Sequence, residues 1–220
     1  QATVDVIQSC MPNIKNAWQM PSVDLDACLV AIRIATYGES LDITTKVPGI
    51  GEERDFAVDL RTVLSKIVTP EFDNMLVIND INIELRPLTY KEFTESNLKT
   101  FEEQRIFTLV NDDEMDDAEK LGRFSASFKK LTNITVNMMV KSIAKLQIGD
   151  TEVTNRVHIE EFIDNVDKEF FKGITDHLET QREKFAIEPI KVQSNEEDIA
   201  AGAPETYEIP ITFDQSNFFG

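Results

Sequence analysis

The chain has 220 residues, of which 41% are hydrophobic, and its 40 acidic and 22 basic residues give a net charge of −18. That length and apolar content suffice for one sizeable core or for two compact lobes, and the 8 Gly and 8 Pro argue against a disordered chain. The negative charge disfavours direct binding to nucleic acid or to anionic membranes, because phosphate contacts require Lys or Arg. The sequence contains no run of 18 apolar residues, so no membrane span is expected, and the first ten residues do not resemble a secretory signal.

The first 70 residues predict a helix followed by a β-ribbon. Residues 23–37 carry apolar residues at helical spacing and are followed by Gly38, a typical stop. Cys28 lies within this run and is predicted to be a buried thiol, and its spacing from Cys10 matches no metal or redox motif. Residues 41–60, LDITTKV-PGIGEER-DFAVDL, predict two strands joined by a turn in which both glycines have positive φ.

The next segment predicts a short helix and a β-hairpin. Residues 61–68 favour a helix that ends before Pro70. Residues 75–88 favour two short strands with a turn at Asn79 and Asp80, and Pro87 closes the second strand because it cannot donate to a sheet.

From Thr89 onward the pattern becomes helical. Thr89 and Glu92 predict a capping box at the start of a long amphipathic helix. Further helices are predicted over about 116–133, over 134–148 with Gly149 as the stop, and over two segments between 157 and 185. Phenylalanines at helical spacing are predicted to pack in the core, and they are Phe93, Phe101, Phe124, Phe128, Phe162, Phe170, Phe171 and Phe185.

A second ribbon is predicted over residues 187–213, and its alternating apolar residues resemble those of the first ribbon. Ribbons this short are not stable alone, so we infer that the two pair or pack together. The predicted fold class is α+β, with a β-ribbon unit built from both flanks and a mainly helical block inserted between them. The predicted domains are an N-terminal α/β flank with two hairpins (1–88), a helical block (89–186) and a C-terminal β-ribbon (187–220) that returns to the N-terminal flank.

The tip of the first ribbon is the kind of turn that carries a CPxCG zinc knuckle, but Val47 and Ile50 stand where the thiolates would be needed. The acidic run 111–117 fails as a calcium loop, because the positions that require Gly and Glu hold Asp117 and Arg123. His158 and His177 fit no metal motif either. No metal and no cofactor is therefore expected.

Catalytic motifs are also missing from the sequence. Gly49 and Gly51 form a bare GxG in a hairpin, without the third glycine or the strand-to-helix setting of a dinucleotide site. No phosphate-binding loop is present, and Gly38-Glu39-Ser40 lacks the closing glycine of a nucleophile elbow. We expect no catalytic residues, and we expect that the protein is not an enzyme.

The sequence DQSNFFG places Phe218 and Phe219 outside any periodic element. Aromatic residues favour interface cores, so these two are the candidate partner-binding residues. Two alternatives stay open, in which they dock into the core of this chain or into a partner.

The order of these pieces resembles a known family. SVDLDACLVAIRIATYGESLDITTKV followed by the knuckle-like turn and DFAVDL, then INIELRPLTYKEF leading into FEEQRIF, and the ending EIPITFDQSNFF, are similar to the baseplate proteins of T4-like contractile-tailed bacteriophages. The resemblance covers residues 20–219. It implies a role in the baseplate hub, and it implies that some relatives carry CPxC-type turns, from which this chain departs at Val47 and Ile50.

The functional hypothesis is a structural subunit of a phage tail baseplate, in the central hub, that acts by protein–protein assembly without catalysis. Its partners would be other baseplate and hub proteins in a multi-subunit assembly. Its location would be the virion tail, after assembly in the host cytoplasm. The alternatives are a non-structural assembly chaperone for the hub and a degenerate zinc-ribbon-like adaptor protein.

Overall fold

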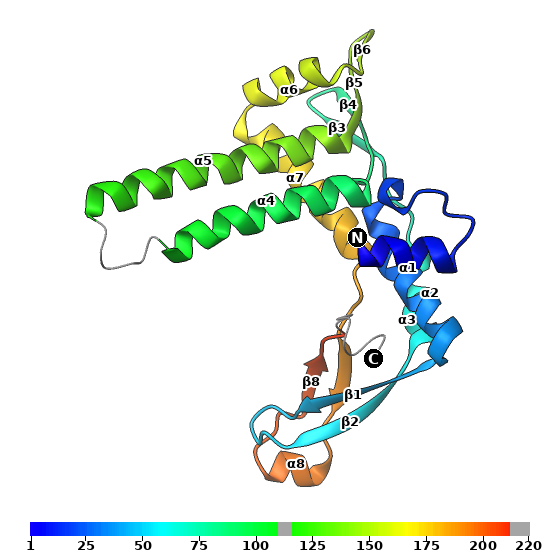
Figure 1. The fold of residues 1–220 in the computed structure, drawn as a ribbon. Coiled ribbons are helices and arrows are strands. Elements are labelled where there is room, and N and C mark those ends of the chain that lie inside the picture. The colour runs from blue at the N-terminus through cyan, green and yellow to red at the C-terminus, as the bar shows by residue number, and fades with distance from the viewer. Residues whose placement is uncertain (110–115, 212–220) are drawn as a thin grey trace. The chain divides into compact units, whose positions relative to one another are not determined.

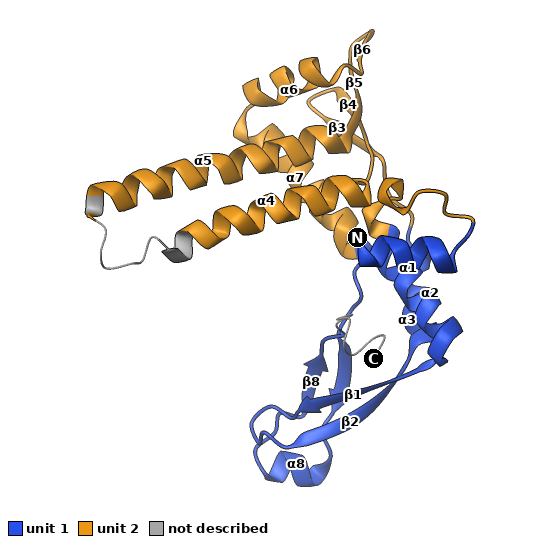
Figure 2. Ribbon diagram, in the orientation of Figure 1, with its two compact units in different colours: residues 1–12, 24–70, 184–220 blue, residues 13–23, 71–183 orange. Residues whose placement is uncertain are grey.

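The structure is a computed structural model that describes residues 1–109 and 116–211, and in this range helices and small antiparallel sheets make an α+β fold (Figure 1). The predicted fold class is thus confirmed. The chain divides into two compact units, each with its own hydrophobic core (Figure 2). Unit 1 comprises residues 1–12, 24–70 and 184–220, and unit 2 comprises residues 13–23 and 71–183.

Unit 1 contains both predicted ribbons, each as a separate two-stranded antiparallel sheet. The second ribbon pairs Ile190–Gln193 with Thr206–Ile209, and a helical turn capped by the side chain of Asn195 lies in the connection between these strands. Its elements are α1 (Ala2–Cys10), α2 (Leu25–Tyr37), β1 (Ser40–Lys46), β2 (Glu53–Asp59), α3 (Leu60–Val68), β7 (Ile190–Gln193), α8 (Glu196–Ala200) and β8 (Thr206–Ile209).

The core of unit 1 lies between α2, α3 and the first ribbon. The alternation of side chains along β1 and β2 turns Leu41 and Val58 inward, where they pack with buried residues of the two helices. Cys28 is buried as predicted, and α2 ends at Gly38, whose φ is +94°. Helix α1, which the sequence pattern did not predict, buries Val4 and Ile7.

The two ribbons of unit 1 contact each other through side chains. Arg54 Nη2 lies 2.9 Å from Asp198 Oδ1, and the rings of Phe56 and Tyr207 meet edge to face with centroids 6.2 Å apart. The backbone of Gly49 also lies against Gly202. These contacts confirm the inferred packing, although β1–β2 and β7–β8 do not share a sheet in the described part of the chain.

Unit 2 is built on a four-stranded antiparallel sheet in the order β3-β4-β5-β6. Its core is formed by the sheet, by α6 and α7, and by the C-terminal end of α5, with Ile83, Leu146 and Ile174 fully buried. Its elements are the 3₁₀ helix η1 (Ala17–Gln19), β3 (Met75–Ile78), β4 (Ile81–Leu85), α4 (Tyr90–Leu109), α5 (Asp117–Ser142), β5 (Ile143–Ile148), β6 (Thr151–Val153), α6 (Arg156–Asn165) and α7 (Lys168–Lys184).

Two expectations about this unit need correction. The helices predicted over 116–133 and 134–148 are one continuous helix, α5, and it ends at Ser142 because the following residues form β5. Residues 143–148 form a strand because they pair with β4, where Leu146 lies opposite Ile83. The hairpin β3–β4, which the prediction grouped with the N-terminal flank, belongs to this same sheet. Its turn has positive φ at Asn79 and Asp80, as a two-residue hairpin requires.

A candidate interaction surface on a helical hairpin

Helices α4 and α5 lie side by side as an antiparallel hairpin (Figure 1). The carboxylate of Glu103 on α4 accepts hydrogen bonds from Ser127 Oγ at 3.0 Å and from Lys130 Nζ at 3.0 Å, both on α5. Ser96 and Ser127 are buried where the helices meet, and such small side chains allow close approach of two helices. Polar contacts and small residues therefore hold this pair together.

The capping box predicted at the start of α4 is confirmed. Thr89 N–H donates to Glu92 Oε2 at 3.0 Å, and Glu92 N–H donates to Thr89 Oγ1 at 3.2 Å. Arg86 adds a two-pronged ion pair to Glu92, with both nitrogen–oxygen distances at 2.9 Å. Burial raises the pKa of Glu92, but the hydrogen bonds from Arg86 and Thr89 and the charge of Arg86 outweigh it and lower that pKa from 4.5 to about 2. This network fixes the base of the hairpin.

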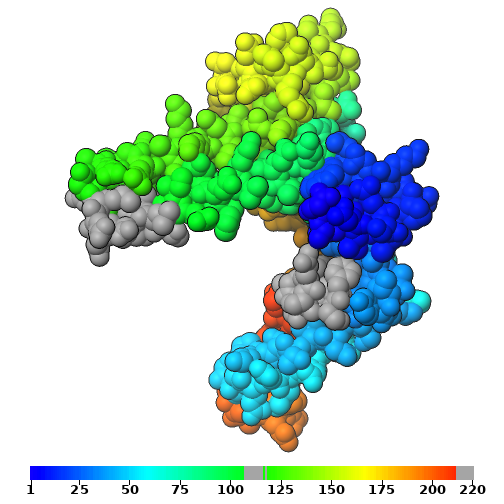
Figure 3. Space-filling view, viewed as in Figure 1, coloured from blue at the N-terminus to red at the C-terminus, as the bar shows by residue number. Residues whose placement is uncertain are grey.

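Much of the hairpin lies outside the core of unit 2. Between Ala118 and Asn133 of α5, Ser127 is the only buried residue, and contact with the core begins at Val136 and becomes complete at Met139 and Val140. Figure 3 shows the two helices as a green surface that extends away from the yellow surface of α6. The sequence of this segment therefore is not explained by packing within the described chain.

The hairpin exposes large apolar side chains instead of burying them. On α4, Leu98 is 58% exposed and Phe101 is 59% exposed. On α5, the exposed fractions are 69% for Leu121, 48% for Phe124 and 61% for Phe128. Apolar residues gathered on one exposed element are typical of protein–protein interaction sites. This hairpin is a candidate interaction surface that the sequence interpretation missed.

The prediction that all the helical phenylalanines lie in the core is wrong for Phe101, Phe124 and Phe128. It is right for Phe170, which is buried and meets the ring of Phe162 edge to face. The reason is that helical spacing identifies a shared face but does not say what covers that face. The available signal was the run of polar and charged residues between these positions, which is unusual for a helix inserted in a core.

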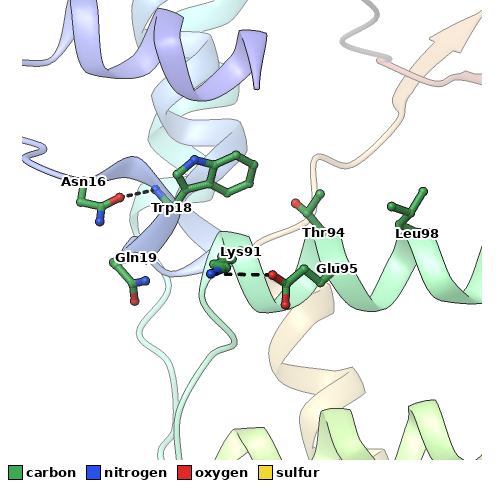
Figure 4. A pocket seen from close by; sticks show the side chains of 7 residues that line it. All are labelled: Asn16, Trp18, Gln19, Lys91, Thr94, Glu95 and Leu98. Atoms are coloured by element: carbon green, nitrogen blue, oxygen red, sulfur yellow. Dashed lines mark hydrogen bonds and ion pairs between the residues drawn. The ribbon is translucent and has the colours of Figure 1, made fainter.

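A small pocket lies at the base of the same hairpin, next to Trp18 (Figure 4). The Asn16 side chain caps η1 by accepting a hydrogen bond from Trp18 N–H at 3.1 Å, and the Trp18 ring stacks on Tyr90 with centroids 5.5 Å apart. The pocket has a volume of about 360 Å³ and is lined by Asn16, Trp18, Gln19, Lys91, Thr94, Glu95 and Leu98. Trp18 and Leu98 give this pocket apolar surface that suits an apolar side chain of a protein partner.

The residues singled out from the sequence do not meet at this surface. Phe218 and Phe219 lie outside the described residues, so their role in binding stays a prediction, which removal of residues 218–220 tests through stability and association. Most of the acidic run 111–117 also lies outside them. Val47 is buried, and its N–H donates to the Glu52 carbonyl at 2.8 Å, so an apolar residue and a backbone turn close the first ribbon.

The possible metal ligands are dispersed over the chain. His158 is exposed on α6, and His177 Nε2 lies 2.9 Å from the Asp73 carbonyl oxygen. Cys10 is exposed and Cys28 is buried. In the part of the chain that the structure describes, no three His, Cys, Asp or Glu side chains are grouped so that they could hold a metal ion.

Comparison with known proteins identifies a family. A family model described as T4 bacteriophage base plate protein matches residues 1–201, which include all of the described hairpin. No curated protein and no solved structure gives a significant match. Of the helices in the described ranges, none is both long enough and apolar enough to cross a membrane.

Proposed function

This chain belongs to the family of T4 bacteriophage base plate proteins, and from that premise we propose that it is a structural subunit of the tail baseplate, located in the central hub. It acts by protein–protein assembly, without catalysis and without a cofactor. Its partners are other baseplate and hub proteins, and it joins them in the host cytoplasm before the tail is complete.

The observation that carries this proposal is the exposed apolar surface of the α4–α5 hairpin. A segment that contributes little to the core of its own chain, yet carries Leu121 and Phe128 more than half exposed, gains stability when a neighbouring subunit covers it. The Trp18 pocket adds a recess on the same unit. The sequence motifs support the absence of catalysis, since none of the tested nucleophile, phosphate-loop or metal patterns is complete.

Mass spectrometry of purified phage particles tests the proposal. We expect peptides of this chain in finished tails, in a fixed ratio to other baseplate proteins and enriched in the hub fraction. Presence in hub intermediates but absence from finished particles would instead identify an assembly chaperone. Stoichiometric zinc in the purified protein would favour the zinc-ribbon-like adaptor.

A pair of matched variants tests the surface itself. Replacing both Leu121 and Phe128 by Ser is expected to reduce incorporation of the chain into tails without lowering its thermal stability. Val157 on α6 is equally exposed, at 61%, and Val157→Ser is the control that should leave incorporation unchanged. Equal incorporation of the two variants would contradict a role for the hairpin.

A further inference from the structure

We propose that the stripe formed by Leu121, Phe124 and Phe128 on α5 docks an acidic amphipathic helix of another tail protein. We call this set of three residues the α5 stripe. The inference rests on the proposed function, which places the partner in the phage tail. It adds which surface of this chain binds the partner and what chemistry the partner has.

The α5 stripe has the geometry of a helix-packing seam. Its residues are spaced i, i+3 and i+7, which places them within about 60° of arc on one side of α5 and over about 10 Å along the helix axis. Leu121 is 69% exposed and Phe128 is 61% exposed, so the described chain leaves most of their apolar surface uncovered. A partner helix of about three turns with apolar residues at the same spacing matches this length.

Two lysines, Lys120 and Lys129, flank the stripe. Helix α5 begins with Asp117 and Glu119, and from Lys120 to Ser142 it has five basic residues and no acidic residue. Arg123 and Lys130 are paired within the hairpin, with Glu119 at 2.8 Å and with Glu103 at 3.0 Å. Lys120 and Lys129 lie on opposite sides of the stripe and make no ion pair with any described residue.

A basic rim around an apolar stripe selects a partner with carboxylates around an apolar stripe. Complementary rim charges steer association and fix the register of two helices, while the apolar anchors supply the affinity. A second copy of this chain fits poorly, because two facing α5 stripes bring four lysines together. An anionic membrane also fits poorly, since the strongly negative protein is repelled by it and the stripe offers only three apolar anchors.

Photo-crosslinking in the phage particle tests this inference. A photoreactive phenylalanine analogue placed at position 128 of the full chain, with position 157 on α6 as the matched control, is irradiated in infected cells and in purified tails. We expect position 128 to crosslink to a segment of another tail protein whose apolar residues recur at helical spacing and whose flanking residues are Asp and Glu. A crosslink to a second copy, to lipid or to a basic or neutral segment would overturn the inference, as would no crosslink from particles that contain the chain.

The test separates this inference from the proposed function. The expected crosslink in infected cells, together with absence of the chain from finished tails, would overturn the proposed function while supporting the docking site. If the chain is present in finished tails but position 128 crosslinks to a second copy, to lipid or to a basic or neutral segment, the docking inference is overturned and the proposed function is supported.

Charge reversal provides the second arm of the test. Lys120→Glu combined with Lys129→Glu is expected to lower the crosslink yield from position 128 about tenfold. Lys46→Glu combined with Lys168→Glu makes the same change in net charge at exposed positions on other elements, and it should leave the yield unchanged. Equal yields from the two double variants, with unchanged thermal unfolding, would show that the basic rim does not select the partner.

Discussion

Glu92 links several groups at the start of the hairpin. It receives both prongs of Arg86 and closes the capping box with Thr89, so one carboxylate joins the end of β4 to the first turn of α4. Its side chain is only 18% exposed, and these bonds therefore form where water competes weakly.

Replacing Glu92 by Gln is expected to lower the free energy of unfolding by about 2 kcal/mol at pH 7, because charge-assisted bonds are lost beside a half-buried arginine. The folded pKa is about 2 and the ordinary value is 4.5, so the carboxylate stabilises the fold fully above pH 4.5 and loses this effect as the pH falls through 2. Urea titrations at several pH values measure both effects. Glu95→Gln, at an exposed ion pair, is the control, and equal stability of the two variants at pH 7 would contradict the role given to Glu92.

Gly49 tests the contact between the two ribbons of unit 1. Its φ is +88°, and a Cβ at this position would meet the carbonyl oxygen of Gly202. Gly51 has a φ of +75°, but a Cβ there would meet nothing within 4 Å. Gly51→Ala should therefore cost about 1–2 kcal/mol from backbone strain alone, and Gly49→Ala should cost clearly more. Thermal unfolding measures the stability of both variants. Equal losses of stability would mean that the backbone at Gly202 can move aside and that its contact with Gly49 adds no stability.

At the scale of elements, the base of the α4–α5 hairpin contributes to the core of unit 2, and its far part is the proposed binding surface. Its base takes part in the core through Val136, Met139 and Val140, whereas residues 118–133 of α5 bury no apolar side chain. An element whose outer half is dispensable for its own core is suited to a neighbour's surface.

Replacing residues 99–130 by a four-residue Gly/Ser linker is expected to change the thermal midpoint of unit 2 by no more than about 5 °C, since the core is retained. Incorporation into tails should be lost in the same variant. Ile174→Ala, a fully buried core position, is the comparison and should be the more destabilising change, by about 2–5 kcal/mol. Near-ultraviolet circular dichroism and melting curves make the comparison, and global unfolding of the shortened chain would show that the hairpin is needed for the fold.

At the scale of the whole molecule, the described residues form a separate hydrophobic core in each of the two units. One surrounds Leu60 in unit 1, and the other surrounds Ile174 in unit 2. Unit 1 is assembled from segments far apart in the sequence, so its ribbons depend on the return of the chain after α7.

Leu60→Ala is expected to reduce amide hydrogen-exchange protection in α2, α3 and β1–β2 while leaving β4 and β5 protected. Ile174→Ala should produce the opposite pattern, because each substitution leaves a cavity in one core only. Native-state hydrogen exchange with mass spectrometry resolves the segments. Loss of protection in both units from either substitution would mean that the molecule unfolds as a single cooperative body.

The sequence alone determined what depends on neighbouring residues. The stop of α2 at Gly38, the hairpin turn at Asn79–Asp80 and the capping box of Thr89 and Glu92 are local features, and the structure shows each of them. The order of these pieces also carried the family resemblance, which the match over residues 1–201 bears out.

Tertiary structure decided what depends on distant partners. Residues 143–148 have apolar residues that suit a helix or a strand, and β4 made them a strand by pairing with them. Phe128 and Phe170 both lie at helical spacing, but the sheet and α6 cover only Phe170. A periodic pattern fixes the direction of a side chain relative to its own helix, whereas burial of that side chain requires a second surface, which only the tertiary structure supplies.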